Sequence, residues 1–282
     1  MDAPLNSATR ILHDVIRARI LGGIIFIKKP YKCYTLRMKK VVIIGGSGFI
    51  GLKLLELKPA DVNMVATYNT SVKDMANVVW EKCDLAQPKE TKQLLTKIHP
   101  DIIINVSKAE ATAIEPIIEY AKANKVRLLH VSSDAVFDGV LGNYKEGDAP
   151  QPITTYGKGK LEEEQKIKEA LSDYVIVRTS YVYGKSGGEW DKRTRNLSKA
   201  PRVTAYTNMF RTPTLVDDVA KRIWEIALSD RSGIMHVAGP KMNMPSFFRM
   251  LAENAGLIID VDEKECIDDE IALDTSLENS TT

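Results

Sequence analysis

Short apolar runs alternate with longer amphipathic stretches along most of the chain beyond Lys39. The runs are uninterrupted, which is typical of strands covered on both faces of a parallel sheet; they occupy residues 41–44, 62–67, 78–80, 101–106, 127–132 and 174–179. The stretches between them have the length and spacing of helices, at residues 49–57, 89–98, 111–124 and 155–171. This alternation predicts an α/β fold of the Rossmann type, with a doubly wound parallel sheet.

The alternation ends after Gly184, where a polar and charged segment extends to Pro201. A helix is then expected at Leu215–Leu228, a strand at Ile234–Val237 and another helix at Ser246–Ala255. These later pieces are too few for a second large domain. We therefore expect a main sheet domain at residues 38–183 with 213–230, and a small C-terminal lobe at 184–212 and 231–282.

Residues 1–37 form a basic segment ahead of the predicted domain. They carry seven Lys or Arg and two acidic residues, and they include an apolar run of eight residues, Ile20–Ile27. A membrane-spanning helix needs roughly 20 apolar residues, so this run is too short to cross a bilayer. We expect residues 1–37 to be a dispensable leader; a signal peptide and a basic amphipathic anchor are the alternatives.

Composition excludes several classes of function. The 282 residues carry 39 basic and 37 acidic side chains, so no field of one sign attracts the chain to nucleic acid or to a membrane surface. The three cysteines, Cys33, Cys83 and Cys266, are widely spaced and form no CxxC pair. This favours a reducing, cytoplasmic location and argues against a disulfide scaffold and against a metal site.

The first predicted strand runs directly into Gly45-Gly46-Ser47-Gly48-Phe49-Ile50-Gly51. Glycine allows a tight turn and lets the backbone approach a diphosphate closely. The helix that follows presents N–H groups and the positive end of its dipole to that anion. Because this glycine spacing stands between a strand and a helix at the start of a βαβ unit, it predicts a dinucleotide-binding turn.

The end of the second predicted strand bears on the choice between NAD and NADP. An acidic residue there would bind the ribose 2′-hydroxyl of NAD. Here the strand ends in Ala66-Thr67-Tyr68-Asn69-Thr70-Ser71, with no acid, and Lys73 follows. Small polar groups and a lysine could accommodate a 2′-phosphate. We therefore expect Asn69 to lie at the cofactor and NADP to be preferred, with NAD as the alternative.

A serine, a tyrosine and a lysine are the candidate catalytic residues. Tyr156 and Lys160 are four residues apart in a predicted helix, so they lie on one helical face. A nearby ammonium and a hydrogen-bond donor would lower the pKa of a tyrosine phenol from its usual value of about 10. Ser133 ends the fifth predicted strand, at the edge where open α/β sheets bind ligands, and can supply that donor. Such a tyrosine can exchange a proton with a carbonyl oxygen while a hydride moves.

With these motifs in this order, the sequence resembles the extended short-chain dehydrogenase/reductase family, and within it the dTDP-4-dehydrorhamnose reductases. The most specific segment is Val131-Ser132-Ser133-Asp134-Ala135-Val136-Phe137-Asp138-Gly139, which is similar to the S-T-D-Y-V-F-D-G segment of that subfamily. Tyr144-Lys145-Glu146 follows it. The resemblance extends from Lys39 to about Leu277, and its other carriers are residues 41–51, 84–85, 100–106, 156–163, 178–184, 211–220 and 273–277.

The resemblance implies a role for each matching residue. Ser133 matches the catalytic Ser/Thr, Tyr156 the acid, and Lys160 the residue that binds the nicotinamide ribose. Together with Asn69, the cofactor-binding residues are then Gly45, Gly48, Phe49, Ile50, Asp84, Leu85, Val106, Ser107, Tyr156 and Lys160. The substrate-binding residues are Ser133, Asp134 and Tyr181. The implied activity is NADPH-dependent reduction of the 4-keto group of a dTDP-4-dehydro-6-deoxyhexose, in dTDP-rhamnose biosynthesis. The resemblance also allows a homodimer and, as in some members, a Mg²⁺ ion.

Departures from the family pattern keep other functions open. The segment between Asn105 and Ser133 is shorter than in the family, and relatives continue beyond the position of Leu277. A non-catalytic NADP-binding subunit, similar to the regulatory subunit of methionine adenosyltransferase, is one alternative. A sugar-nucleotide epimerase or dehydratase is another. The charged run Leu161–Lys166 is interpreted as the solvated face of its helix.

Overall fold

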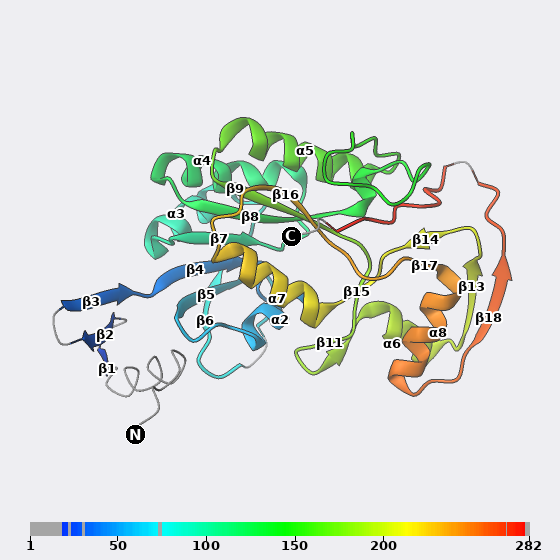
Figure 1. Cartoon of the computed structure of the whole chain (residues 1–282), viewed down its shortest axis with the longest axis horizontal. Coiled ribbons are helices and arrows are strands. Elements are labelled where there is room, and N and C mark those ends of the chain that lie inside the picture. Colours follow the sequence, from blue (N-terminus) through cyan, green and yellow to red (C-terminus); the bar gives the residue numbers. More distant parts are fainter. Residues whose placement is uncertain (1–18, 22–23, 30–31, 73–74, 269, 280–282) are drawn as a thin grey trace, which may run out of the picture.

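A seven-stranded sheet forms the main body of the computed structural model, which describes residues 19–21, 24–29, 32–72, 75–268 and 270–279. The strand order is β16-β9-β8-β7-β4-β5-β6, and every neighbouring pair is parallel (Figure 1). The strands are β4 Lys39–Ile44, β5 Val62–Tyr68, β6 Val79–Lys82, β7 Ile102–Asn105, β8 Arg127–Ser133, β9 Tyr174–Thr179 and β16 Gly233–Val237.

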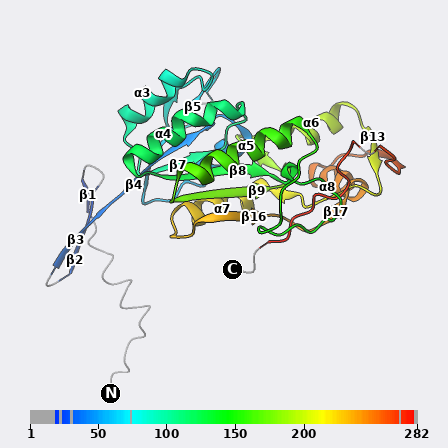
Figure 2. The ribbon, with the colours of Figure 1, turned by 90° about the horizontal axis from the view of Figure 1, so that it is seen from above.

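Helices cover both faces of this sheet. Val41 and Ile43 of β4 point into a core shared with α2 and α7, whereas Val42 and Ile44 point into a core shared with α3, α4 and α5. Figure 2 shows α3, α4 and α5 on one side of the sheet and α7 on the other. The helices are α2 Phe49–Glu56, α3 Pro88–Ile98, α4 Glu115–Asn124, α5 Thr155–Ala170 and α7 Val216–Ala227. The doubly wound α/β fold predicted from the continuous apolar runs is therefore confirmed.

The strand order reverses between β4 and β7. The chain leaves β4 for α2 on one face, and it leaves β7 for α4 on the other face. The loops after these two strands therefore diverge at the carboxyl edge of the sheet. This divergence opens the crevice in which open α/β sheets bind their ligands.

A smaller lobe lies beyond the carboxyl edge, on the right in Figure 1. Phe247 is fully buried at the centre of its apolar core, with Leu197, Ala205 and Leu251 around it. The lobe contains the helices α6 Lys192–Lys199 and α8 Met244–Ala255 and the parallel pair β13 Arg202–Tyr206 and β18 Asp260–Lys264. Two-residue strands complete it, namely β10 Val182–Tyr183, β11 Lys185–Ser186, β12 Glu189–Trp190, β14 Phe210–Arg211, β15 Thr214–Leu215 and β17 Met242–Asn243.

The expected extent of the lobe is wrong for one strand. We expected Ile234–Val237 to lie in the lobe, but β16 pairs with β9 along its whole length and forms the edge of the main sheet. The physical reason is α7, which returns the chain across the sheet and buries Met235 and Val237 against its own apolar face. The segment between β9 and α7 is therefore an excursion from the sheet domain.

The expected helix at residues 111–124 is divided in two. Ala111–Ile114 form a 3-10 turn, η1, and the α-helix α4 begins at Glu115. Pro116 explains the division, because proline lacks a backbone N–H and is favoured in the first helical turn. The helix therefore begins where the sequence places its proline.

Residues 19–37 contribute a separate three-stranded sheet in the described part of this segment. Its strands are β1 Arg19–Leu21, β2 Ile24–Lys29 and β3 Lys32–Arg37, in the order β1-β2-β3. Both views place it beside the amino end of β4 and away from the lobe (Figures 1 and 2). Residues 1–18 of the expected leader lie outside the described residues. Within the described residues, no helix combines the length and the apolar character that crossing a membrane requires.

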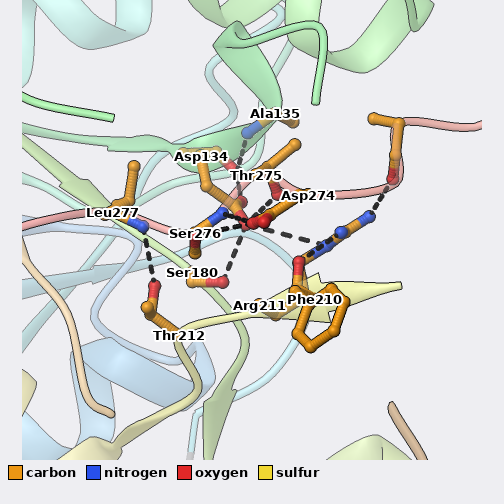
Figure 3. A network of polar contacts seen from close by, with 12 residues as sticks. Asp134, Ala135, Ser180, Phe210, Arg211, Thr212, Asp274, Thr275, Ser276 and Leu277 are labelled. Atoms are coloured by element: carbon orange, nitrogen blue, oxygen red, sulfur yellow. Dashed lines mark hydrogen bonds and ion pairs between the residues drawn. The ribbon is translucent and has the colours of Figure 1, made fainter. Parts of the chain in front are cut away.

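The last described segment joins the lobe to the sheet (Figure 3). The carboxylate of Asp134, which follows β8, accepts hydrogen bonds from Ser180 Oγ at 2.7 Å and from Thr275 Oγ1 at 2.8 Å. Arg211 of β14 donates to the carbonyl oxygens of Ala272 and Leu273, at 2.8 and 2.9 Å. Three chain segments that are distant in sequence are thereby fastened around one carboxylate.

A buried ion pair joins α5 to the sheet. Arg178 of β9 donates to both carboxylate oxygens of Glu164, at 3.0 and 2.7 Å, and Ser132 Oγ donates to the same carboxylate at 2.5 Å. The side chains of Arg178 and Glu164 are each 1% exposed. The interpretation of Leu161–Lys166 as a solvated face is therefore wrong at Glu164.

Replacing Arg178 by Met is expected to lower the free energy of unfolding by about 3–5 kcal/mol, because Glu164 would remain buried without its cation. The exposed pair of Lys97 with Glu81 provides the control: Lys97→Met is expected to cost about 1 kcal/mol or less. Urea denaturation of both variants measures the difference. Equal losses in the two variants would contradict the assignment of Arg178 to a structural pair.

Candidate functional site

One cavity of about 1400 Å³ lies at the carboxyl edge of the sheet, between the sheet and the lobe. Its lining comes from the loops after β4, β5, β6, β7, β8 and β9 and from the start of α5. It brings together every residue that we expected at the site: Gly45, Gly48, Phe49, Ile50, Asn69, Asp84, Leu85, Val106, Ser107, Ser133, Asp134, Tyr156, Lys160 and Tyr181. The roles assigned to these residues stay predictions, but their common location is a finding.

The turn between β4 and α2 has the geometry that a diphosphate needs. Gly45 has φ of +83°, which favours glycine. A Cβ on Gly51 would lie 2.3 Å from the carbonyl oxygen of Gly45, so α2 can pack this closely only with glycine there. Gly48 stands at the N-cap of α2 without a side chain to cap it. The first N–H groups of α2, which have no intrahelical acceptor, therefore face the cavity.

The far end of the cavity is lined by the ends of β5 and β6. Asn69 Nδ2 lies 3.5 Å from Asp84 Oδ1, and Leu85 lies beside them in the lining. Asn69 and Asp84 thus present an amide and a carboxylate to the same part of the cavity. Lys73, which we considered for a 2′-phosphate, lies outside the described residues.

The loop after β7 packs against the glycine turn. A Cβ on Gly45 would approach the backbone of Ser107 to 2.9 Å. Ser107 donates both its backbone N–H and its hydroxyl to Asn105 Oδ1, at 3.1 and 2.7 Å. Asn105 therefore fixes the loop that carries Val106 and Ser107 along the cavity wall.

Local structure at the start of α5 places Tyr156 beside Ser133. Thr154 caps the helix by accepting a hydrogen bond from the N–H of Gly157 at 3.0 Å. A Cβ on Gly157 would lie 2.0 Å from the carbonyl oxygen of Ala135, so only glycine lets the helix meet the turn after β8 this closely. The Tyr156 hydroxyl is then within hydrogen-bond reach of the Ser133 side chain.

The pKa of Tyr156 is raised, which differs from the expected direction. Tyr156 is 51% exposed overall, but partial desolvation of its hydroxyl group disfavours the tyrosinate most. The negative charges of Asp134 and Glu163 add to this effect, whereas the hydrogen bond with Ser133 opposes it. Lys160 was expected to lower this pKa. Its ammonium instead pairs with the Glu163 carboxylate, which offsets its charge.

Sequence reasoning missed a chain of buried polar groups behind Lys160. Lys160 Nζ lies 2.8 Å from Glu163 Oε2, and His130 Nε2 lies 3.3 Å from the same oxygen. His130 is fully buried and Glu163 is 3% exposed. The interpretation of residues 161–166 as a solvated face is therefore wrong at Glu163 as well. The available signal was the spacing from Lys160 to Glu163, which places both on one helical face.

Asp134 and Tyr181 line the cavity in different ways. Asp134 is 4% exposed, and its carboxylate accepts hydrogen bonds from Ser180 and Thr275 (Figure 3). It also accepts a hydrogen bond from the Ser133 hydroxyl at 2.9 Å. Tyr181 presents its ring to the guanidinium groups of Arg193, at 3.7 Å from the ring centre, and of Arg211, at 5.7 Å. Tyr181 therefore holds two cations at the lobe side of the cavity.

Three cations, Lys108, Lys192 and Arg193, lie near one another where the sheet meets the lobe, and we call them the cationic rim. Lys108 and Arg193 line the cavity, and the pKa of Lys108 is lowered by burial and by the charges of Arg193, Lys160 and Lys192. Among the side chains that the structure describes, no carboxylate pairs with these three cations. Uncompensated cations around a cavity favour an anionic ligand. Sequence reasoning missed this cluster, because Lys108 and Arg193 come from distant segments.

The chemistry of the lining fits a dinucleotide. The glycine turn and the α2 terminus supply N–H donors for a diphosphate, and the Lys160 ammonium retains donors for ribose hydroxyls.

The side chains offer less to a metal ion than to a dinucleotide. Across the described ranges, no group of three or more His, Cys, Asp or Glu side chains is placed to bind one. The described side chains therefore provide no cluster of three protein ligands for the Mg²⁺ that the resemblance allows.

Comparison with a family of known proteins agrees with this geometry. The model of the family described as the RmlD substrate binding domain matches residues 38–257. The match begins at the first strand of the main sheet and ends just after α8. It therefore covers both the glycine turn and most of the lobe.

Individual relatives share both sequence and fold. The dTDP-4-dehydrorhamnose reductase of Salmonella typhimurium is 26% identical over 255 residues, which are 80% of this chain and 83% of that protein. A hypothetical dTDP-4-dehydrorhamnose reductase from Sulfolobus tokodaii has a crystal structure with a TM-score of 0.73 and 27% identity, over 86% of this chain and 92% of that one. The fold is also similar to that of the Bacillus anthracis dTDP-4-dehydrorhamnose reductase in complex with NADP, with a TM-score of 0.72 and 22% identity over 86% and 91% of the two chains.

Gly51→Ala is expected to weaken NADPH binding at least about tenfold, because its methyl group would push α2 away from Gly45. Gly147→Ala is the matched control, since a Cβ there meets nothing within 4 Å. Titration of NADPH fluorescence measures both affinities, and circular dichroism checks that each variant is folded. A folded Gly51→Ala protein with unchanged affinity would disprove the turn's proposed part in binding.

Proposed function

The chain belongs to the RmlD substrate binding domain family, and we propose that it is an NAD(P)-dependent reductase of the 4-keto group of a dTDP-4-dehydro-6-deoxyhexose. The observation that carries this proposal is the meeting of Ser133, Tyr156 and Lys160 in the cavity that the glycine turn opens. These residues supply a proton donor, a hydrogen-bonding hydroxyl and an ammonium, which are the groups that reduction of a ketone requires.

Each of the three residues has a separate role in the reduction. Bound NADPH supplies the hydride that reaches the ketone carbon. As negative charge develops on the ketone oxygen, the Tyr156 hydroxyl donates its proton to that oxygen. Ser133 orients the Tyr156 hydroxyl by a hydrogen bond. Tyr156 has a raised pKa and is therefore protonated at neutral pH, which is the form that a reductase requires. Lys160 binds the nicotinamide ribose and holds the reactants in register.

The cofactor is proposed to be NADP rather than NAD. The end of β5 offers Asn69, Thr70 and Ser71 and no carboxylate of its own, so a 2′-phosphate meets small polar groups there. The Bacillus anthracis relative with NADP supports this choice. Asp84 approaches Asn69 from β6 and is proposed to contact the adenosine.

The substrate is proposed to be a nucleotide-linked sugar because the cationic rim suits a diphosphate. Lys108 and Arg193 face the cavity from the sheet side and the lobe side, so an anion between them contacts both. The names of the relatives, dTDP-4-dehydrorhamnose reductases, supply the identity of the sugar nucleotide. In this arrangement the diphosphate occupies the rim and the ketone reaches Tyr156.

Consumption of NADPH with dTDP-4-keto-6-deoxyhexose tests the proposal directly. The wild-type protein is expected to oxidise one NADPH for each ketone reduced, and more efficiently than NADH. An epimerase or dehydratase consumes no cofactor overall, and a non-catalytic NADP-binding subunit binds NADPH without turnover. Either of those results would overturn the reductase proposal.

Tyr156→Phe is expected to lower kcat at least about 100-fold, because the variant lacks the proton donor. NADPH affinity should change little, since the ring remains. Tyr174→Phe is the control, because Tyr174 lies at the opposite, amino end of β9. Steady-state kinetics and NADPH titration measure these quantities, and a Tyr156→Phe protein as active as wild type would remove the tyrosine from the reaction.

Lys108→Met and Arg193→Met are each expected to raise the KM for the sugar nucleotide about tenfold, because each removes a charge-assisted contact with the diphosphate. The KM for NADPH should change much less. Lys199→Met is the control, since Lys199 is exposed at the end of α6, the helix that carries Arg193. Unchanged KM values for the sugar nucleotide in both variants would show that the rim does not bind it.

A further inference from the structure

The buried chain of polar groups behind Lys160 continues through the sheet to the cofactor loop. Ser107 donates to Asn105 Oδ1, and Asn105 Nδ2 lies 3.2 Å from His130 Nδ1. His130 Nε2 lies 3.3 Å from Glu163 Oε2, which lies 2.8 Å from Lys160 Nζ. The chain links the loop after β7, strand β8 and helix α5, and both of its ends lie in the cavity lining.

The hydrogen-bond pattern fixes the protonation of His130. The backbone N–H of Ser107 can only donate, so the Asn105 atom that faces it is the oxygen. Asn105 therefore directs its amide group to His130 Nδ1, which must accept. The proton of the neutral imidazole is then on Nε2, which lies 3.3 Å from Glu163 Oε2. The lowered pKa of His130, caused mainly by burial and also by the charge of Lys160, agrees with this neutral form.

Glu163 is ionised in this setting. Burial raises the pKa of its carboxyl, but contacts with His130 and Lys160 outweigh that effect and lower the pKa overall. A buried carboxylate thus stands next to the ammonium of Lys160, four residues along α5 from Tyr156. The result is a neutral pair in the place where an unpaired ammonium was expected.

We propose that Glu163, oriented by His130, is a positioning residue that anchors the Lys160 ammonium and keeps the Tyr156 hydroxyl protonated, ready to donate. The inference rests on the proposed function, because only a reductase needs the tyrosine as an acid at the start of each turnover. Glu163 touches neither the ketone nor the cofactor in this role. It acts through the charge that it places beside Lys160 and Tyr156.

The sign of the effect follows from the groups around Tyr156. Those that face Tyr156 or Lys160 are Ser133 of β8, Asp134 after β8, Glu163 of α5, His130 of β8 and Lys108 after β7. Removing the charge of Glu163 takes away a carboxylate that disfavours the tyrosinate, and it frees the Lys160 ammonium, which favours the tyrosinate. Both changes lower the pKa of Tyr156.

Glu163→Gln is therefore expected to move the alkaline limb of the pH–rate profile for ketone reduction to lower pH by about one unit. Glu162→Gln is the matched control, because Glu162 carries the same charge one residue away but is about half exposed and pairs with Lys166. Glu164→Gln is a second control: it disturbs the other buried carboxylate of α5, so it should lower stability without the same shift. Glu163→Asp keeps the charge and should restore most of the wild-type profile.

A measurement that needs no turnover separates this inference from the proposed function. Tyrosinate absorbance at alkaline pH, taken as the difference between each protein and the same protein carrying Tyr156→Phe, reports the titration of Tyr156 alone. The same shift to lower pH is expected in Glu163→Gln. An unshifted tyrosine in folded Glu163→Gln protein would overturn the inference even if the reductase activity is real. If Glu163→Gln does not fold, titration of Glu163→Asp decides: a tyrosine identical to wild type supports the role of the charge, and one that moves to higher pH contradicts it.

Discussion

The register of α5 against β8 is the constraint on which the site depends. Three levels of contact set it: Tyr156 lies beside Ser133, Glu163 lies beside His130, and Ile167 packs in the same apolar core as Leu128. The helix therefore runs antiparallel to the strand. A slip of one residue would turn every side chain by about 100° around the helix axis. Tyr156 would then lose its place beside Ser133, and Lys166 or Lys168 would replace Ile167 in the apolar core next to the buried carboxylates of Glu163 and Glu164.

Burying those two carboxylates is costly unless each has a partner. Glu164 has the guanidinium of Arg178 and the hydroxyl of Ser132, whereas Glu163 has the ammonium of Lys160 and the imidazole of His130. Because Glu162, Glu163 and Glu164 are consecutive, the charges alone would tolerate a slip of one residue, and the register is specified by Ile167 and Tyr156. The ion pairs offset the cost of burying the two carboxylates in that register. The same charges also determine the electrostatic surroundings of the tyrosine.

The fold was largely predictable from the sequence, because continuous apolar strands and the Gly45–Gly51 turn depend on local pattern. The common location of Ser133, Tyr156 and Lys160 was predictable for the same reason: strand ends and helix starts meet at one edge of a parallel sheet. The burial of Glu163 and Glu164 was not. A run of charged residues predicts a solvated helix face unless its buried partners are known. Here the partners Arg178 and His130 come from two strands of the sheet. The placement of Ile234–Val237 was missed for a similar reason: its partner strand β9 comes before the lobe in the sequence, whereas Ile234–Val237 comes after most of it.

The charges near Tyr156 differ in sign from those near Lys108, and the difference suits the proposed reduction of an anionic substrate. The carboxylates of Asp134 and Glu163 lie near Tyr156, and the cations Lys192 and Arg193 lie near Lys108. The cavity lining also contains the acidic residues Asp84, Glu110, Glu115 and Glu270. An ammonium that was left unpaired at Lys160 would join the rim cations and compete for the diphosphate. It would also favour the tyrosinate form of Tyr156. In the proposed function, pairing Lys160 with Glu163 prevents both: the substrate's charge would be directed to the rim, and the acid would remain protonated where the ketone binds.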